Sequence, residues 1–479
     1  MDQQKGYSLK KKFAKDFGIY AIGNIGSKLV TFMLVPLYTY FITNPADFGY
    51  YDICMTIAFC LVPVVSLQFT EGSFRFLINE KSAQSRSAVI TYVWVTLIRN
   101  SVILLLLGIV IDCIVDIRFL SYIVLFGISQ TFFDVHLQIA RGLKRTDVFV
   151  QASMMNAFSI AVFSVLTVVI LRMGIEGILI SNICARFLSL AFMTVRLELF
   201  KKYLSMKSLN KTVKTDLLKY SIPLLPMAMA WWVLNSNNLF FIKHFLGLEE
   251  NGIYAVLAKF TSILYVLANI FYQTWQQNAL ENYHSENRDQ FFTNVFNSYV
   301  YILCVLAALF PFAVRLNYFW LVSPEYESSA QYLFINSIVI VSFALAAFFE
   351  LGYQCAKKTR RLLPSIFLAA IINMALNYFL VRHIGLYGII FSSIITFQTL
   401  FIYRWIDTKK YMKVRFNTDN LPAIVILVVS GFLYSGNSGV AWDIGCIALT
   451  SILLIIAMPK MIRQNFLKML PCKRYRQLK

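Results

Sequence analysis

Long apolar stretches separated by short polar segments dominate the hydropathy pattern of this chain. A first apolar run of about 26 residues follows residues 1–16, and further stretches lie at roughly 53–71, 88–111, 119–140, 148–171, 175–195, 220–243, 252–275, 292–314, 330–352, 362–381, 386–406, 421–436 and 440–458. Most reach the ~20 residues with which an α-helix crosses a bilayer. They lack the alternation of membrane β-strands. The pattern therefore predicts about fourteen transmembrane helices.

The basic residues between these stretches predict an orientation in the membrane. Most of the 44 Lys and Arg residues fall in alternate segments, starting with residues 1–16, and the intervening loops hold only Arg118, Arg172, Lys243, Arg315 and Arg382. Because cytoplasmic loops carry the excess of Lys and Arg, we predict that both termini are cytoplasmic. The first run is too long for a signal-peptide core and lacks a cleavage site, so it is interpreted as an uncleaved span.

The composition agrees with a membrane protein and excludes other classes of protein. The 479 residues are 58% hydrophobic and 14% charged, with a mean hydropathy of +0.64, which excludes an ordinary soluble protein. The net charge of +20 requires no nucleic acid, since the bias of the loops accounts for it. The eight cysteines form no C-x-x-C pair, so we expect no metal and no cofactor. An all-α polytopic membrane protein is predicted.

Internal similarity indicates a duplication. The sequence FFDVHLQIAR at residues 132–141 returns as FFELGYQCAK at 348–357, GIEGI at 174–178 returns as GLYGI at 385–389, and Gly49 with Tyr51 returns as Gly252 with Tyr254. Three pairs in the same order favour two related halves of one orientation. We predict an N-terminal six-helix lobe at 1–200, a basic cytoplasmic linker at 201–219, a C-terminal six-helix lobe at 220–415, and two extra helices with a basic cytoplasmic tail at 416–479.

Two interpretations of the basic linker stay open. It is either a topology signal that lies against anionic headgroups, or an amphipathic strut that also receives a lipid phosphate.

Charged side chains within apolar stretches are the strongest functional candidates, because they are costly in a bilayer. Four cations qualify, and no carboxylate lies at comparable depth: Lys28, Arg99, Arg186 and Lys259. Cations without nearby anions suit an anionic substrate that supplies the missing charge. The alternatives for each are snorkelling to the interface, a pair with a shallower acid, or contact with a lipid headgroup.

The repeated segment places an acid, a Gln and a base on one helix face at the predicted cytoplasmic ends. These residues are Asp134, Gln138 and Arg141 in the first copy, and Glu350, Gln354 and Lys357 in the second. They are candidates for an inner gate. A polar stripe with a cation near the C-terminal helix dipole is an equally simple explanation.

Several motifs resemble the Wzx-type polysaccharide flippases of the multidrug/oligosaccharidyl-lipid/polysaccharide exporter superfamily. They are DFGYY at 47–51, IARGLKR at 139–145, LKYSIPLLP at 218–226 and NGIY at 251–254. The resemblance covers nearly the whole chain and implies export of O-antigen, capsule or exopolysaccharide precursors.

That resemblance implies alternating access, in which an undecaprenyl-diphosphate-linked oligosaccharide crosses the cytoplasmic membrane and its diphosphate meets the buried cations. It implies membrane lipids, a polysaccharide polymerase and assembly proteins as partners. We expect no enzyme activity, since no P-loop, H-E-x-x-H or external D-x-D motif occurs. The alternatives are a drug or metabolite exporter, a lipid II flippase, and, from a different class, a membrane polymerase or glycosyltransferase.

Overall fold

The structure is a computed structural model in which residues 30, 32–78, 80, 82–209, 211–283, 285–356, 358–436, 439–459 and 462 are described. Every regular element in these ranges is helical. Twelve helices are long and apolar enough to cross a membrane, and Phe32–Phe41 and Val440–Ile456 are shorter apolar helices. The prediction of an all-α polytopic membrane fold is confirmed. Most of the first predicted span lies outside the described residues.

Contacts divide the chain into two compact units, of which the first comprises Met1–Lys243 with Gly247–Gly252. Its described helices after Phe32–Phe41 are α2 (Pro45–Ser66), α3 (Phe69–Leu77), α4 (Ala83–Ile114), α5 (Leu120–Gly142), α6 (Thr146–Ser164), η1 (Val165–Ile170), α7 (Gly174–Arg196), α8 (Leu199–Lys202), η2 (Met206–Ser208), α9 (Lys211–Ser221), η3 (Ile222–Leu224) and α10 (Leu225–Phe245).

The second unit comprises His244–Leu246 with Ile253–Lys479. It contains most of α11 (Leu248–Asn282), followed by α12 (Arg288–Leu316), α13 (Tyr318–Leu321), η4 (Pro324–Tyr332), α14 (Leu333–Cys355), η5 (Thr359–Arg361), α15 (Leu362–Ile384), α16 (Leu386–Thr408), η6 (Thr418–Asn420), α17 (Leu421–Gly436) and α18 (Val440–Ile456).

The second span begins and ends earlier than the hydropathy pattern predicts. Asn44 caps α2 by accepting a hydrogen bond from the Ala46 amide, and Pro45 occupies the first turn, where its missing N–H is not needed. Leu67 and Gln68 then adopt positive φ angles of 49° and 59°, which end α2 and separate it from α3. The predicted range of 53–71 was therefore wrong at both ends, because it followed hydropathy and ignored these helix signals.

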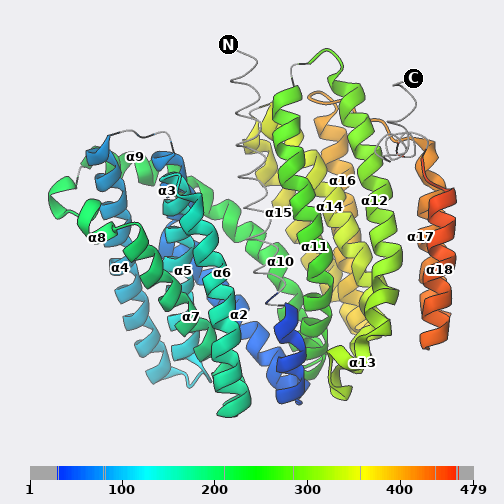
Figure 1. Ribbon diagram of the computed structural model, residues 1–479, viewed down its shortest axis with the longest axis horizontal. Coiled ribbons are helices and arrows are strands. Elements are labelled where there is room, and N and C mark those ends of the chain that lie inside the picture. The colour runs from blue at the N-terminus through cyan, green and yellow to red at the C-terminus, as the bar shows by residue number, and fades with distance from the viewer. Residues whose placement is uncertain are drawn as a thin grey trace, which may run out of the picture. The chain divides into compact units, whose positions relative to one another are not determined.

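The two units repeat one packing arrangement. In the first unit α5 and α6 pack along α7, and in the second α14 and α15 pack along α16 (Figure 1). Gly174 precedes the body of α7 with a φ of +55°, and Gly385 precedes α16 with a φ of +57°. Glycine tolerates this left-handed conformation, which explains why both repeats place it there. Each unit therefore contains one helix that begins with a positive-φ glycine and packs against two others.

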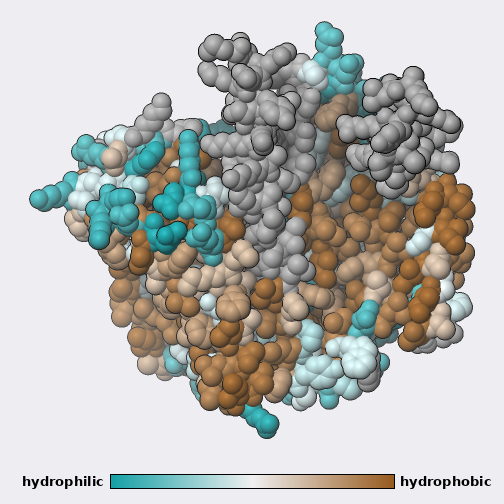
Figure 2. Space-filling model, in the orientation of Figure 1, coloured by the Kyte–Doolittle hydropathy of each residue, from teal (hydrophilic) through white to brown (hydrophobic). Residues whose placement is uncertain are grey.

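The helices differ in how much of their surface faces the bilayer. In the spanning part of α5, 78% of residues are buried, whereas the corresponding value for α4 is 17%. Ile98, Val102, Leu106 and Ile109 follow one another on the exposed face of α4. Figure 2 shows hydrophobic surface along this unit and hydrophilic residues at the end that carries α8 and α9. An apolar face of this kind is suited to contact with lipid chains.

The two last helices are fixed to α12 by a buried ion pair. The Arg315 guanidinium pairs with the Asp443 carboxylate of α18, donates to the Tyr434 carbonyl of α17 at 2.7 Å, and lies 3.9 Å from the Tyr434 ring. Tyr434 in turn donates to the Ala330 carbonyl at 2.6 Å. These bonds hold α17 and α18 against the body of the second unit.

Candidate functional site

Arg186 lies in the middle of α7 and is 6% exposed. Its Nε donates to Gln130 Oε1, and its Nη1 donates to the Asn182 carbonyl at 2.8 Å and to Asn182 Oδ1 at 3.1 Å. The guanidinium carbon is 4.2 Å from the centre of the Phe126 ring, a cation–π contact. The residues that the structure describes place no carboxylate within ion-pair distance of Arg186. Its charge is held by neutral groups.

The acceptors of Arg186 are themselves oriented by second hydrogen bonds. Gln130 Nε2 donates to Asp134 Oδ1 at 2.8 Å, one helical turn along α5, and Asn182 Nδ2 donates to the Ile178 carbonyl at 2.8 Å. Each amide therefore turns its oxygen towards the guanidinium. Gln130 thus lies between Asp134 and Arg186 in this hydrogen-bond network.

A second polar chain lies one turn away on α7. Tyr38 and Ser164 share a hydrogen bond of 2.8 Å, Ser164 and Ser181 share one of 3.0 Å, and Ser181 donates to the Ile178 carbonyl. This chain joins the Phe32–Phe41 helix to α6 and α7. The Ile178 carbonyl accepts from both Ser181 and Asn182, so this chain meets the Arg186 network at that group.

The second unit contains a buried arginine of a different kind. Arg404 of α16 is 1% exposed, and its Nη1 lies 3.2 Å from Glu350 Oε2 and 3.1 Å from the Ala346 carbonyl. Glu350 Oε1 accepts from Gln354 Nε2 at 3.2 Å and from the Tyr272 hydroxyl at 3.4 Å. Gln354 Nε2 also donates to the Tyr272 hydroxyl at 2.9 Å. This network binds α14 to α11 and α16.

The two arginines thus differ in the groups that stabilise their positive charge. Arg404 has a carboxylate partner, whereas Arg186 has amide oxygens and an aromatic face. Within the described chain, Nη2 of Arg186 has no hydrogen-bond acceptor, and it is not among the fully enclosed atoms. A guanidinium with an available N–H edge can bind an anionic oxygen.

The other predicted cations are separate from this cluster. Arg99 is exposed on α4, where its Nε and Nη2 donate to Asn100 Oδ1 at 3.2 and 3.0 Å. Lys259 is half-buried on α11 in the second unit. Lys28 lies outside the described residues. Of the predicted cations that the structure describes, Arg186 is the one brought into a buried polar network.

The gate candidates also make specific contacts. Arg141 Nη1 donates to Gln138 Oε1 at 3.1 Å, and the guanidinium carbon lies 4.8 Å from the centre of the Phe74 ring. Asp134 accepts from Gln130, one turn before it on α5. Glu350 pairs with Arg404, and Gln354 Oε1 accepts from Gln276 of α11 at 2.7 Å. Lys357 lies outside the described residues.

Sequence reasoning missed Gln130, Asn182 and Arg404. Arg404 stands near the end of its apolar stretch, where a cation that reaches the interface is ordinary, and its burial becomes visible only in the packed structure. Asn182 precedes Arg186 by four residues and therefore lies on the same helix face, which is a signal that the sequence did contain.

Two helical units with buried polar interiors and twelve helices of spanning length in the described residues make this a multi-pass membrane protein. The chain belongs to the polysaccharide biosynthesis protein family, whose model matches residues 13–275. The resemblance in its sequence motifs is thereby confirmed. No curated protein sequence matches the chain.

Solved structures show the same fold at low sequence identity. The lipid II flippase MurJ in an inward closed conformation matches with a TM-score of 0.68 and 14% identity, over 94% of this chain and 99% of that one. An inward-facing multidrug resistance MATE family transporter of the MOP superfamily matches with a TM-score of 0.61 and 11% identity, over 82% and 95%. A mutant of the Vibrio cholerae MATE transporter VcmN matches with a TM-score of 0.56 and 13% identity, over 84% and 97%.

Proposed function

We propose that the protein is a flippase that translocates undecaprenyl-diphosphate-linked oligosaccharide units across the cytoplasmic membrane by alternating access, for the synthesis of a surface polysaccharide. Membership of the polysaccharide biosynthesis family and the transporter fold support this proposal. The observation that carries it is Arg186, a buried cation held by neutral oxygens.

The chemistry of Arg186 favours a phosphate ligand. A buried charge without an opposite charge is costly in a membrane protein, and a diphosphate supplies the compensation when it binds. Arginine binds phosphate oxygens through its planar set of N–H donors. The amides of Gln130 and Asn182 orient that plane in advance. Lys28, Arg99 and Lys259 stay proposed as further substrate-binding cations.

We place the protein in the cytoplasmic membrane with both termini in the cytoplasm, and we propose the acid, Gln and base faces of α5 and α14 as an inner gate. Reversal of the charge at Asp134 should reduce export, and a further reversal at Arg141 should restore it if the two charges act together. Failure of the double variant to restore export would leave the helix-end polar stripe as the explanation.

Other functions remain as outcomes of the test. A lipid II flippase would use the same cations on a different lipid-linked sugar, and a drug exporter would use the same fold on a different ligand. A polymerase or glycosyltransferase would act chemically on the sugar, whereas we propose transport without catalysis. A polysaccharide polymerase and assembly proteins are the proposed partners.

The deciding experiment combines gene deletion with Arg186 variants and mass spectrometry of lipid-linked sugars. Deletion should cause a complete undecaprenyl-linked repeat unit to accumulate while the surface polysaccharide is lost. Arg186→Gln should do the same at normal protein level, because a glutamine can still bond to the neighbouring amides. Arg186→Lys should keep part of the activity through its charge.

Arg172→Gln is the matched control, since this arginine is exposed in the loop before α7 and should be dispensable. Normal export by Arg186→Gln would contradict the role of the cation. Unchanged lipid-linked sugars with altered drug sensitivity after deletion would indicate a drug exporter, and accumulation of lipid II would indicate the cell-wall precursor as cargo.

A further inference from the structure

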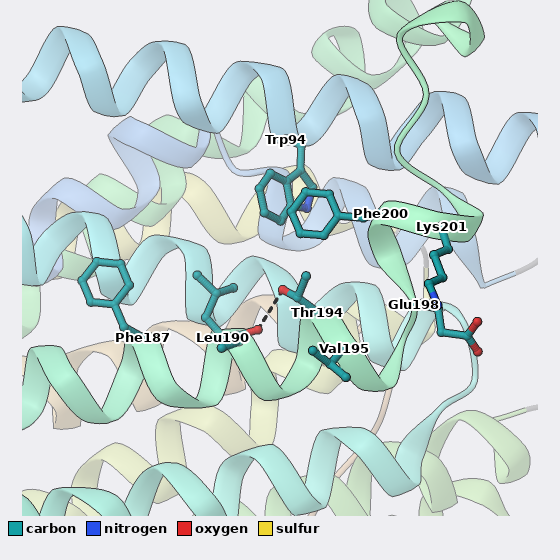
Figure 3. Close-up of a pocket in the computed structure, with 9 residues that line it drawn as sticks. Trp94, Phe187, Leu190, Thr194, Val195, Glu198, Phe200 and Lys201 are labelled. Atoms are coloured by element: carbon teal, nitrogen blue, oxygen red, sulfur yellow. Dashed lines mark hydrogen bonds between the residues drawn. The ribbon is translucent and has the colours of Figure 1, made fainter.

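A groove opens on the surface of the first unit between α4, α7 and α8. It has a volume of about 530 Å³, within the ~300–1,000 Å³ range of ligand pockets. Figure 3 shows Trp94 and Phe200 on one side and Phe187, Leu190 and Val195 along α7. The Thr194 hydroxyl donates to the Leu190 carbonyl at 2.8 Å, so it presents little polarity to the groove.

The wall of the groove is fixed by aromatic packing. The centre of the Trp94 ring lies 5.8 Å from the ring centre of Phe132, 5.1 Å from that of His136 and 5.7 Å from that of Phe200. Each pair packs edge to face. Phe132 and His136 belong to the buried helix α5. Trp94 therefore links the groove to the rigid core of the unit, and the groove is a built part of the fold.

The lining side chains lie at the membrane surface of the unit. Phe187 is 44% exposed, Val195 is 73% exposed and Phe200 is 67% exposed. Exposed apolar side chains of this size along a spanning helix mark a surface that interacts with a membrane or another protein. The groove is therefore suited to a lipid chain.

The turn into α8 sets a charge at the mouth of the groove. Glu198 adopts a φ of 52° and redirects the chain, while Leu199 is fully buried and anchors the turn. Phe200 and Lys201 are thereby held outside. Glu198 and Lys202 form an ion pair at 2.8 Å, and the hydrogen bond from Lys202 lowers the pKa of the Glu198 carboxyl.

Lys201 is the basic residue that lines this mouth, beside the Glu198 carboxyl, whose pKa its charge also helps to lower. It is exposed, lines the groove, and has no ion-pair or hydrogen-bond partner in the described part of the chain. The linker that follows adds further exposed lysines in the same unit, at Lys207, Lys211 and Lys214. An anionic lipid fits this arrangement, because its phosphate is attracted to the lysines and its acyl chain suits the apolar groove.

We propose that this groove is a binding site for an anionic phospholipid of the bilayer, with one acyl chain against Trp94, Leu190 and Phe200 and the phosphate at Lys201. The site is separate from Arg186 and does not depend on which substrate the protein carries. It gives the basic linker a lipid partner in addition to its role in topology.

The test uses the full-length protein in detergent and native mass spectrometry with added phosphatidylglycerol or phosphatidylcholine of identical acyl chains. The protein should retain phosphatidylglycerol preferentially. Lys201→Glu should lower that retention about fivefold or more, because an attraction becomes a repulsion. Ala191→Trp should lower retention of both lipids, since Ala191 lines the groove and is exposed.

Lys207→Glu is the matched control, because it makes the same charge change outside the groove lining and should have a much smaller effect. Ala191→Leu provides a milder filling variant, and melting temperatures verify that each variant is folded. Equal losses in Lys201→Glu and Lys207→Glu would overturn the site in favour of diffuse attraction. Unchanged retention in a folded groove-filling variant, or preferential displacement of phosphatidylglycerol by undecaprenyl phosphate, would also overturn it.

Discussion

At the scale of single side chains, the buried arginines of α7 and α16 predict different responses to the same substitution. Replacing Arg404 with Met leaves the partly buried Glu350 carboxylate without its ion-pair partner. Breaking a fully buried ion pair costs ~3–5 kcal/mol, so we expect a loss near the lower end of that range. Replacing Arg186 with Met removes donors from two amides, which costs ~1–3 kcal/mol. Thermal unfolding of the purified variants should therefore show the larger loss for Arg404→Met.

The matched control is the double variant Arg404→Met with Glu350→Gln. It removes both charges and should recover most of the lost melting temperature, since a neutral pair carries no uncompensated charge. Equal destabilisation by Arg186→Met and Arg404→Met would mean that Arg186 also has a structural counter-charge. That result would weaken the case for an anionic substrate at Arg186.

At the scale of helices, Gly49 and Gly252 mark a close crossing of α2 with the start of α11. A Cβ atom on Gly252 would lie 1.9 Å from the Pro45 carbonyl oxygen, and Asn251 Nδ2 donates to the Gly49 carbonyl at 3.2 Å. Gly252→Ala should therefore separate the two helix ends and lower stability by ~1–3 kcal/mol or more. The yield of monodisperse protein and its melting temperature provide the measurement.

Gly445→Ala is the corresponding control within α18, where a new Cβ meets nothing within 4 Å. It should be neutral or stabilising by up to ~1 kcal/mol, as alanine favours helix. If Gly252→Ala has the same melting temperature as the unmodified protein, the two helices can move apart without loss of stability. The close crossing would then have no role in stability.

The sequence predicts which segments form helices. It does not predict where the helices end or which side chains pair. Hydropathy located the spanning segments, because burial in lipid demands long apolar runs. It missed the start of α2, which Asn44 and Pro45 determine through local hydrogen bonding. It also missed the pairing of Glu350 with Arg404, because the two residues meet only when α14 packs against α16. Arg186 was found because a charge inside an apolar run is visible without any knowledge of packing.

At the scale of the whole molecule, the native cysteines offer a test of the proposed orientation. Cys113 is exposed one residue before the end of α4, between Asp112 and Asp116, and the following loop carries Arg118. The distribution of basic residues predicts that this loop faces the outside. A membrane-impermeant maleimide should therefore label Cys113 in intact cells, and Cys113→Ser should abolish that labelling.

The opposite face is tested in the Cys113→Ser background with Lys207→Cys, because Lys207 is exposed in the basic segment that we assign to the cytoplasm. This variant should react only after the membrane is permeabilised. Labelling of Lys207→Cys in intact cells would invert the topology and place the Lys201 groove in the outer leaflet. Since cytoplasmic leaflets carry the anionic lipids that attract basic segments, the same result would also remove the physical basis for a phosphate at Lys201. The lipid site therefore depends on the proposed orientation, while the lipid-retention measurements test the site itself.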